Sequence, residues 1–174
     1  MSQTPEEIAL ERIRQAADSG AESLDLSELG LTSLPHEIGQ LTNLTQLDLS
    51  ENLLTNLTSE IMQLVNLTYF DLSNNQLTNL PYEISHLDKL KELRLFYNHL
   101  TNLPYEFSYL TGLEALDLYN NQLDIVPPEI FQLNNLTYLA LGGNHLKEIP
   151  PEIGQLTNLV HLYLGRKYRI GWGG

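Results

Sequence analysis

The chain has 174 residues, no cysteine and a formal net charge of −13. That length is sufficient for one domain with a hydrophobic core, and the lack of cysteine excludes disulfide bonds, cysteine-rich zinc sites and a catalytic thiol. An acidic chain without a basic stripe is poorly suited to bind nucleic acid, because attraction to phosphate supplies much of that affinity.

The acidic residues are concentrated in the first half of the chain. Residues 1–88 contain fourteen acidic and two basic side chains, a balance of −12, whereas residues 89–174 contain eight and seven, a balance of −1. The opening segment MSQTPEEIALERIRQ has charges in place of the apolar run of a secretory signal. No stretch reaches the ~20 apolar residues of a membrane span. We therefore expect a cytoplasmic protein without a membrane or nucleic-acid partner.

The first predicted element is an N-terminal helix. Thr4, Pro5 and Glu7 have the pattern of an N-cap, a first-turn proline and a capping-box glutamate. We expect the helix to continue through Ala17 and to stop near Gly20. Its apolar residues are suited to cover the core of the segment that follows, so residues 1–20 are assigned to a capping helix.

From Asp18 onward the sequence repeats with a period of 23 residues. A degenerate first unit is followed by units that begin at Leu41, Leu64, Leu87, Leu110, Leu133 and Leu156. Each unit approximates L-x-x-L-x-L-x-L-x-x-N-x-L-x-x-L-P-x-E-I-x-x, in which the alternating leucines have the period of a strand. One unit cannot bury its leucines alone, so neighbouring units must stack into a solenoid with parallel strands.

This pattern resembles the leucine-rich repeat over nearly the whole of residues 18–165. It is most similar to the 23-residue class with an LPxEIxxLxNL segment, as in cytosolic Ras-group-related repeat proteins and the repeat domain of bacterial Roco proteins. The resemblance implies an α/β fold. We expect a right-handed horseshoe with a parallel concave sheet of about seven strands, short helical or extended convex segments and the N-terminal capping helix.

One asparagine recurs at the turn that follows five of the predicted strands. A buried amide at this place can satisfy backbone groups of adjacent units. We therefore predict a structural asparagine ladder and no catalytic role for its members, which are Asn52, Asn75, Asn98, Asn121 and Asn144.

The C-terminal segment 166–174 is basic and rich in glycine. Lys167 occupies a ladder position, and Trp172 is near the position of a core leucine. Two interpretations stay open. Either Trp172 covers the end of the repeat array, or these residues are a truncated repeat in a chain that naturally continues.

The motifs of common enzymes are missing from the sequence. There is no G-x-x-x-x-G-K-[ST] phosphate loop and no G-x-S-x-G nucleophile motif. The histidines do not have the spacing of a metal site on one helix. We therefore predict no catalytic residue, no metal and no cofactor.

Three columns of residues are expected on the concave face, because side chains that flank the inward leucines point outward. The central column is Asp25, Asp48, Asp71, Arg94, Asp117, Ala140 and Tyr163. The preceding column, two residues earlier, is Ser23, Gln46, Tyr69, Glu92, Ala115, Tyr138 and His161. The following column, two residues later, is Ser27, Ser50, Ser73, Phe96, Tyr119, Gly142 and Gly165.

The fourth and fifth units replace small or acidic residues with a cation and aromatic rings. Tyrosine and arginine are enriched at the energetic centres of protein interfaces. We predict a partner-binding surface formed by Tyr69, Arg94, Phe96, Tyr97, Tyr119, Tyr138 and Tyr163. The flanking Asp48, Asp71 and Asp117 are expected to favour Lys or Arg in the partner.

Some of these residues have simpler explanations. Arg94 stands between two aspartates and can relieve their repulsion across strands. We expect Phe96 and Tyr119 to lie side by side, Gly142, Gly143 and Gly165 to leave a hollow beside them, and Tyr82 and Tyr105 to stack on the convex side as cover for the apolar surface.

The sequence as a whole predicts a non-catalytic module that binds a protein or peptide in intracellular signalling or scaffolding. The alternative is a regulatory or targeting domain of a larger signalling protein such as a Roco-type GTPase. A third reading is homodimerisation through the concave faces, although we expect a monomer.

Overall fold

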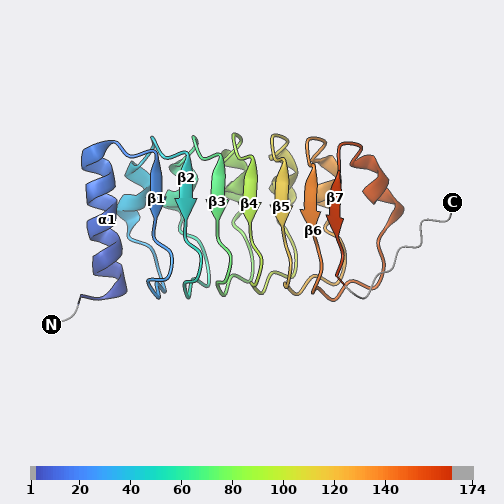
Figure 1. Cartoon of the computed structure of the whole chain (residues 1–174), viewed down its shortest axis with the longest axis horizontal. Helices are drawn as coiled ribbons and strands as arrows, with labels where there is room; N and C mark the ends of the chain where they lie inside the picture. The colour runs from blue at the N-terminus through green and yellow to red at the C-terminus, as the bar shows by residue number, and fades with distance from the viewer. Residues whose placement is uncertain (1–2, 166–174) are drawn as a thin grey trace.

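The computed structural model describes residues 3–165, so the expectations for Lys167, Trp172 and the segment 166–174 lie outside the described residues. A single α-helix, α1 (Pro5–Ser19), comes first and lies at one end of a row of strands (Figure 1). The strands are β1 (Ser23–Asp25), β2 (Gln46–Asp48), β3 (Tyr69–Asp71), β4 (Glu92–Arg94), β5 (Ala115–Asp117), β6 (Tyr138–Ala140) and β7 (His161–Tyr163).

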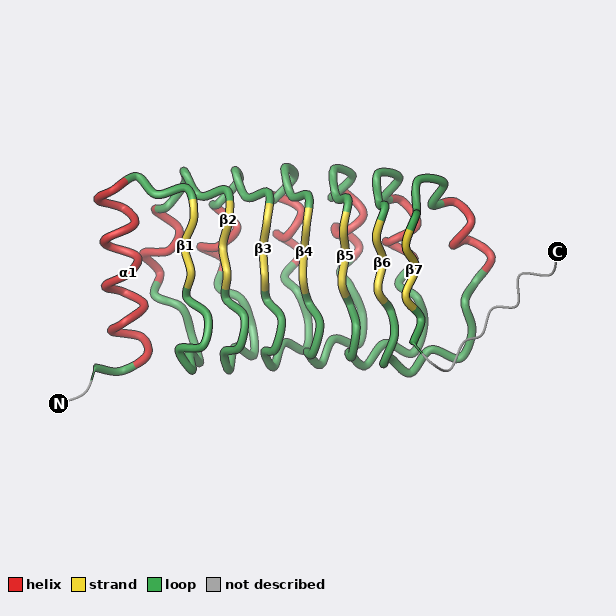
Figure 2. Tube along the Cα trace, viewed as in Figure 1, coloured by secondary structure: helices red, strands yellow, loops and turns green. Residues whose placement is uncertain are grey.

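A short 3-10 helix follows each of the first six strands on the other side of the molecule (Figure 2). These helices are η1 (His36–Gln40), η2 (Ser59–Gln63), η3 (Tyr82–His86), η4 (Tyr105–Tyr109), η5 (Pro128–Gln132) and η6 (Pro151–Gln155).

The seven strands form one parallel sheet in sequence order. Their register follows the repeat, so that Leu47 pairs with Leu24 on one side and with Phe70 on the other. Equivalent residues of successive units therefore lie beside one another across the whole sheet. The predicted α/β solenoid, with its parallel sheet, short helical return segments and N-terminal helix, is confirmed.

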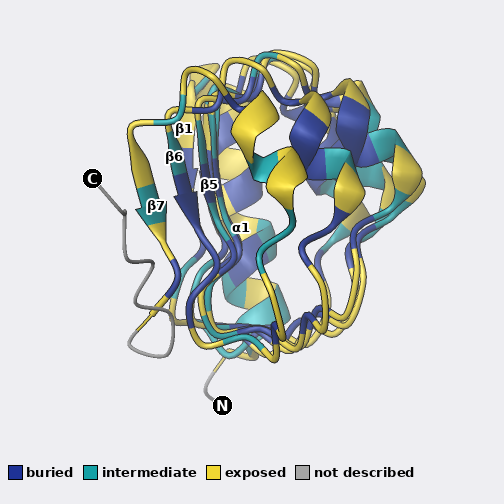
Figure 3. Cartoon of the chain, turned by 90° about the vertical axis from the view of Figure 1, so that its right-hand side faces the viewer, coloured by how far each residue is buried: buried dark blue, intermediate teal, exposed yellow. Residues whose placement is uncertain are grey.

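The hydrophobic core lies between the sheet and the 3-10 helices (Figure 3). Each strand directs one apolar side chain inward between two outward residues, and each return segment adds another. Leu93 of β4 and Phe107 of η4 are both fully buried. The outer surface of the sheet, predicted to be the concave face, is therefore free to vary without loss of the core. We call this surface the sheet face and the opposite surface the helical side.

A proline precedes most of the 3-10 helices. Pro81, for example, has φ −69° and ψ 152° immediately before η3, a conformation that the proline ring favours. Thr58 takes this place before η2 with φ −77° and ψ 149°. Its hydroxyl is buried without a hydrogen-bond partner within the described residues, so this polar group does not stabilise the fold.

The helix α1 has the predicted caps. Thr4 accepts a hydrogen bond from the backbone N–H of Glu7, whose side chain accepts one from the backbone of Thr4. Gly20 ends the helix in the left-handed conformation at φ 63°. Ala9 and Ile13 are buried against the first repeat unit, so α1 closes this end of the core.

The asparagines after the strands join the turns of adjacent units. The Nδ2 of Asn75 donates to the carbonyls of Leu49 and Leu72, at 2.9 and 3.1 Å. Its Oδ1 accepts the backbone N–H of Leu54 at 3.0 Å. One amide therefore satisfies buried backbone groups from its own unit and from the unit before it. The same three kinds of hydrogen bond are made by Asn52, Asn98, Asn121 and Asn144.

The end of the array opposite α1 is apolar within residues 3–165. A hollow of about 730 Å³ is lined there by Ile149, Ile153, Leu159 and Leu162, among others. Among the described helices, none has the length and apolar character needed to cross a bilayer.

Candidate functional site

The sheet register places the predicted site residues on adjacent strands. Arg94 of β4 pairs with Asp71 of β3 and Asp117 of β5, and Tyr138 of β6 pairs with Ala115 of β5. Side chains at paired positions lie roughly 5 Å apart in a sheet. The predicted residues on β3 to β7 therefore belong to one continuous region of the sheet face.

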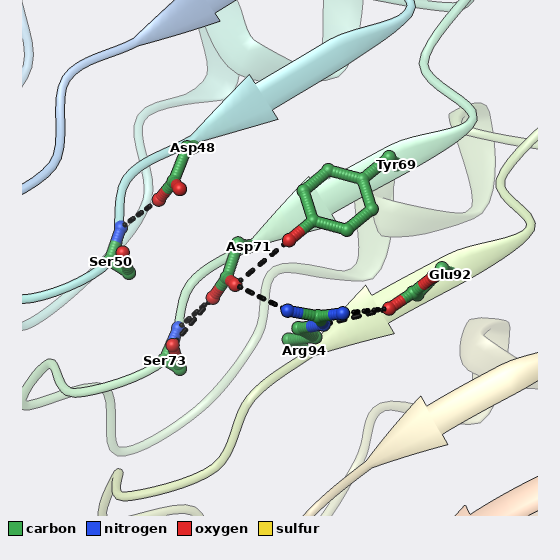
Figure 4. A network of polar contacts seen from close by, with 7 residues as sticks. All are labelled: Asp48, Ser50, Tyr69, Asp71, Ser73, Glu92 and Arg94. Carbon is green, nitrogen blue, oxygen red and sulfur yellow. Dashed lines mark hydrogen bonds and ion pairs between the residues drawn. The ribbon is translucent and has the colours of Figure 1, made fainter.

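Arg94 is held by residues of its own chain (Figure 4). Its Nε and Nη2 both lie 2.7 Å from Oε1 of Glu92, two residues earlier on the same strand. Its Nη1 lies 3.7 Å from Oδ2 of Asp71, and its guanidinium carbon is 5.2 Å from the centre of the Tyr69 ring. The cation therefore leans toward β3, and its fixed position shapes the surface beside β5.

The structure does not favour the prediction that Asp71 contacts a partner. Its side chain is buried and only 5% of the residue is exposed. The hydroxyl and backbone N–H of Ser73 donate to Oδ1 at 2.6 and 2.9 Å, and the hydroxyl of Tyr69 donates to Oδ2 at 3.1 Å. Because its lone pairs are used internally, Asp71 orders β3 and Arg94 instead of meeting a partner.

The network also fixes the protonation of its members. Burial, together with the charge of Asp71, raises the pKa of Tyr69 to about 12, so its hydroxyl stays a donor at neutral pH. Burial alone would lower the pKa of Arg94, but the hydrogen bond and charge of Glu92 outweigh it and raise that pKa. This corner of the site is therefore a fixed cation with an adjacent phenol.

The aromatic rings form two contact groups on the sheet face and at its edge. Tyr97 contacts Phe96 and Tyr119 edge to face, with ring centres 6.0 and 5.7 Å apart. Phe96 and Tyr119 are thus connected through Tyr97, which the sequence did not predict. Tyr138 and Tyr163 form the second group, with ring centres 5.5 Å apart. We call Phe96, Tyr97, Tyr119, Tyr138 and Tyr163 the aromatic surface.

Tyr97 has an unusual backbone for its residue type. Its φ is 53°, in the left-handed region, where a non-glycine residue with a bulky side chain is disfavoured by about 1 kcal/mol. The equivalent position is Glu28 and Glu51 in the first two units and Asn74 and Asn120 in the adjacent ones, all with positive φ, and asparagine tolerates this conformation best of these. Tyr97 is also 48% exposed, so the fold alone does not explain the tyrosine.

Two hollows adjoin one another over β4 to β7. The larger, of about 410 Å³, is lined by Glu92, Leu93, Arg94, Phe96, Ala115, Asp117 and Tyr138. The smaller, of about 250 Å³, is lined by Phe96, Asp117, Tyr119, Tyr138, Ala140, Tyr163 and Gly165. Three lining residues are common to both, which makes a groove with a charged half and an aromatic half.

The floor of this groove depends on small residues that were not among the predicted site residues. Ala115 lines the larger hollow and Ala140 the smaller. The column comparison contained the signal, because Ala140 stands where most units have aspartate, and Ala115 interrupts a column of larger residues. The two alanines form the bottom of the groove, and the larger aromatic side chains beside them form its sides.

The predicted glycine hollow is present in part. Gly165 lines the smaller hollow. Gly142, in contrast, is buried beneath it, and a Cβ there would lie 2.8 Å from the backbone N of Gly165 and 3.1 Å from the Tyr119 ring. Gly142 is therefore required for close packing and is not itself open space.

The expectation for the helical side was wrong in one respect. Tyr105 pairs with Tyr109 of the same 3-10 helix, with ring centres 5.9 Å apart, and no stacking of Tyr82 on Tyr105 is recorded in the described residues. Both Tyr82 and Tyr105 are more than 60% exposed, at 63% and 67%. They project into solvent more than they cover the core.

The chemistry available at the groove is recognition. Its charged residues are a paired Arg94 and Glu92 and the half-buried Asp117. Within residues 3–165, no group of three His, Asp or Glu side chains is arranged to hold a metal ion.

The family model described as Leucine rich repeat matches overlapping segments of the chain, at residues 19–77, 44–100, 66–123, 89–146 and 111–166. A comparison with curated proteins gave no match.

Several solved structures are similar. A Leptospira interrogans LRR protein is 37% identical with a TM-score of 0.72, over 87% of this chain and 45% of that one. The plant peptide hormone receptor RGFR1 in complex with RGF2 is 36% identical with a TM-score of 0.71, over 82% and 24%. TLR13, in complex with ssRNA13, is 31% identical with a TM-score of 0.74, over 83% and 21%. The chain thus spans less than half of each of these proteins.

Proposed function

The chain belongs to the leucine-rich repeat family, and we propose that it is a non-catalytic interaction module that binds a protein or peptide on its sheet face. The observation that supports this most is the aromatic surface. Five rings gather over β4 to β7, whereas the first three units have mostly small, acidic or amide residues at the same positions, with Tyr69 as the exception. Contiguous exposed aromatic side chains of this kind are typical of interfaces.

Two further features support the same site. Tyr97 occupies a left-handed turn position that asparagine would fill more easily, and its ring joins those of Phe96 and Tyr119 in one contact group. The adjoining hollows offer concave space beside the rings. Among the similar structures, RGFR1 is described in complex with RGF2 and TLR13 with ssRNA13. The acidic balance of this chain favours a protein over RNA.

We propose a cytoplasmic setting in signalling or scaffolding, as the similarity of the LPxEIxxLxNL units to Ras-group-related repeat proteins suggests. The alternative is a regulatory or targeting domain of a larger signalling protein of the Roco type. The sequence of the natural transcript beyond codon 174 distinguishes them, since a following phosphate loop would establish the second.

Self-association through the sheet face is a competing use of the aromatic surface. We expect a monomer instead, because the net charge of −13 makes two copies of the chain repel each other. Sedimentation velocity over a hundredfold concentration range tests this. A dimer that disappears when Tyr119 and Tyr138 are replaced would assign the surface to a second copy.

The function is tested by affinity capture from a lysate of the source organism. The bait is the wild-type chain beside a variant with Phe96→Ser, Tyr119→Ser and Tyr138→Gln. Serine and glutamine occupy the same columns in β1 to β3 and the turns that follow them, at Ser27, Ser50, Ser73 and Gln46. The fold is therefore expected to survive, which circular dichroism checks.

A matched control removes three tyrosines from the helical side. Tyr82→His, Tyr105→Ser and Tyr109→Gln introduce residues found at equivalent places in His36, Ser59 and Gln63. We expect a protein that is captured by the wild type and by this control but is lost with the sheet-face variant. Capture lost only with the helical-side control would place the site between η4 and η5 and refute the proposal.

A further inference from the structure

The smaller hollow combines one carboxylate with four aromatic rings. Its walls are Phe96, Tyr119, Tyr138 and Tyr163, and Asp117 lines it at the side nearest β4. Ala140 pairs with Asp117 on one side and Tyr163 on the other, so this buried alanine lies between the acid and the ring. The floor is thus small and apolar, and the walls are aromatic.

Asp117 has fewer internal hydrogen bonds than Asp25 and Asp71 of the same column, and as many as Asp48, which within residues 3–165 accepts the backbone N–H of Ser50 alone. In units one and three the serine two residues later donates its hydroxyl to the aspartate, from Ser27 to Asp25 and from Ser73 to Asp71. Tyr119 replaces that serine in the fifth unit, and among the described residues the donor to Oδ1 of Asp117 is the backbone N–H of Tyr119, at 2.9 Å. The substitution that builds the aromatic wall also removes a hydroxyl donor from the carboxylate.

The surroundings make this carboxylate receptive to a cation. Burial raises the pKa of Asp117, although the N–H of Tyr119 and the charge of Arg94 act in the opposite direction. Arg94 cannot neutralise it fully, because its guanidinium is bound to Glu92 and turned toward Asp71. Within residues 3–165, Oδ2 of Asp117 accepts no hydrogen bond, so a half-buried negative charge lies beside the rings.

Resting on the proposed function of the sheet face, we propose that this hollow binds the ammonium group of a lysine side chain in a basic segment of the partner. Its Nζ would donate to the free Oδ2 of Asp117, and its charge and methylene groups would contact the rings of Tyr119, Tyr138 and Tyr163. Aromatic faces attract ammonium ions within about 6 Å of the ring centre. The acidic first half of the chain attracts the same kind of segment over a longer range.

Lysine fits this site better than arginine does. The guanidinium group binds carboxylates best through two parallel hydrogen bonds to both oxygens. One oxygen of Asp117 already accepts the N–H of Tyr119, so a bidentate guanidinium would have to share that oxygen, whereas a compact ammonium needs the other oxygen alone. A volume of about 250 Å³ that is open to solvent accommodates a four-carbon stem.

The experiment selects ligands from a random twelve-residue peptide library displayed on phage. The wild-type chain is the bait, and peptides that also bind the variant Phe96→Ser, Tyr119→Ser, Tyr138→Gln are removed. We expect the remaining peptides to have lysine at one fixed position. For a synthetic copy, replacing that lysine with norleucine should weaken binding at least tenfold by calorimetry, and replacing it with arginine should weaken binding to a smaller degree.

Variants of the chain then assign the effect to the carboxylate. Asp117→Asn should lower the affinity for the lysine peptide at least tenfold. It should also abolish the difference in affinity between the lysine and norleucine peptides. Asp48→Asn is the matched control, because Asp48 is in the same column but lies outside both hollows. It should leave the affinity within twofold of the wild type.

The outcomes separate this inference from the function on which it rests. Peptides that require the aromatic surface but neither a lysine nor Asp117 would overturn the lysine site and leave the interaction module in place. A norleucine peptide that binds as tightly as the lysine peptide, or arginine that binds more tightly, would do the same. A selection that yields no peptide dependent on the aromatic surface would overturn both.

Discussion

The asparagine ladder shows how one residue type determines the turn of five successive units. Asn98 is almost fully buried; its amide donates to the carbonyls of Leu72 and Leu95, and its oxygen accepts the N–H of Leu77. Asn144 makes the equivalent bonds but is only half-buried. Water can therefore replace the amide at Asn144 and cannot do so at Asn98.

Replacing these two asparagines with alanine should have unequal effects. Each buried polar group left without a partner costs about 1–3 kcal/mol, so Asn98→Ala should lower the free energy of unfolding by about 3 kcal/mol. Asn144→Ala should lower it by about 1 kcal/mol, since solvent reaches the freed groups. Urea denaturation followed by circular dichroism measures both. An equal decrease in the free energy of unfolding for both variants would mean that the burial of the ladder hydrogen bonds does not determine their contribution.

Two aspartates of the central column are predicted to have opposite effects on stability. Burial raises the pKa of Asp117, so its charged form destabilises the folded chain. This loss of stability is complete above the raised pKa and disappears below the ordinary value of 3.8. Hydrogen bonds from the side chain and backbone of Ser27 lower the pKa of Asp25. Its charge therefore stabilises the fold above the ordinary pKa, and this contribution is lost as the pH falls through the lowered pKa.

Asp117→Asn should consequently raise the midpoint of thermal unfolding at pH 7, and Asp25→Asn should lower it. Both differences should shrink toward pH 3. A fall in the midpoint for Asp117→Asn would show that the carboxylate is retained for the fold and not for a ligand.

Residue roles were predictable from the columns only where every unit repeats the same environment. The asparagines and strand leucines recur in identical surroundings, so their positions followed from the period. Arg94 does not recur. Its pairing with Glu92, two residues earlier, depends on the side-chain conformation, and the burial of Asp71 depends on the hydroxyls of Ser73 and Tyr69. Such contacts arise from a combination of neighbours found in one unit alone.

Among the repeated elements, η2 is the one preceded by a residue other than proline. Thr58 there already has the backbone angles of proline, φ −77° and ψ 149°. Because prolines occupy this place in other units, the fold needs no hydrogen bond from its N–H. Its buried hydroxyl has no partner.

Thr58→Pro should therefore stabilise the chain. A compatible proline reduces the entropy of the unfolded state by about 0.4–1 kcal/mol, and loss of the unpaired hydroxyl adds to this. We expect the free energy of unfolding to rise by about 1 kcal/mol in urea denaturation. A decrease would mean that the unit around η2 uses the threonine in a way that its neighbours do not.

The helix and the strands were predictable from the sequence, whereas the conformation of the return segments and one contact between their tyrosines were not. The capping box at Thr4 and the strand period gave α1 and the parallel sheet, because both depend on local patterns. The return segments were left as helical or extended, since five residues are too few to show a helical period. The contact between Tyr105 and Tyr109 could not be predicted either, because the two rings meet only if this return segment is helical.

At the scale of the whole molecule, the charge of −13 lies mainly in the units before β4, whereas the aromatic surface lies after it. Charge near an interface acts chiefly on the rate of association. If the partner is basic, raising the ionic strength from 20 to 300 mM should slow association by about tenfold, with a smaller effect on dissociation. Stopped-flow measurement with the captured partner or a selected peptide tests this, and a rate independent of salt would exclude a basic partner.

The central claim is that the aromatic surface, and not the helical side, contacts the partner, and site-specific photocrosslinking tests it most directly. The photoreactive residue p-benzoylphenylalanine replaces Tyr119 in one preparation and Tyr105 in a second, since both tyrosines are exposed but lie on opposite sides of the molecule. We predict a crosslink to the partner from position 119 and none from position 105. A crosslink from position 105 alone would contradict the account and assign recognition to the helical side.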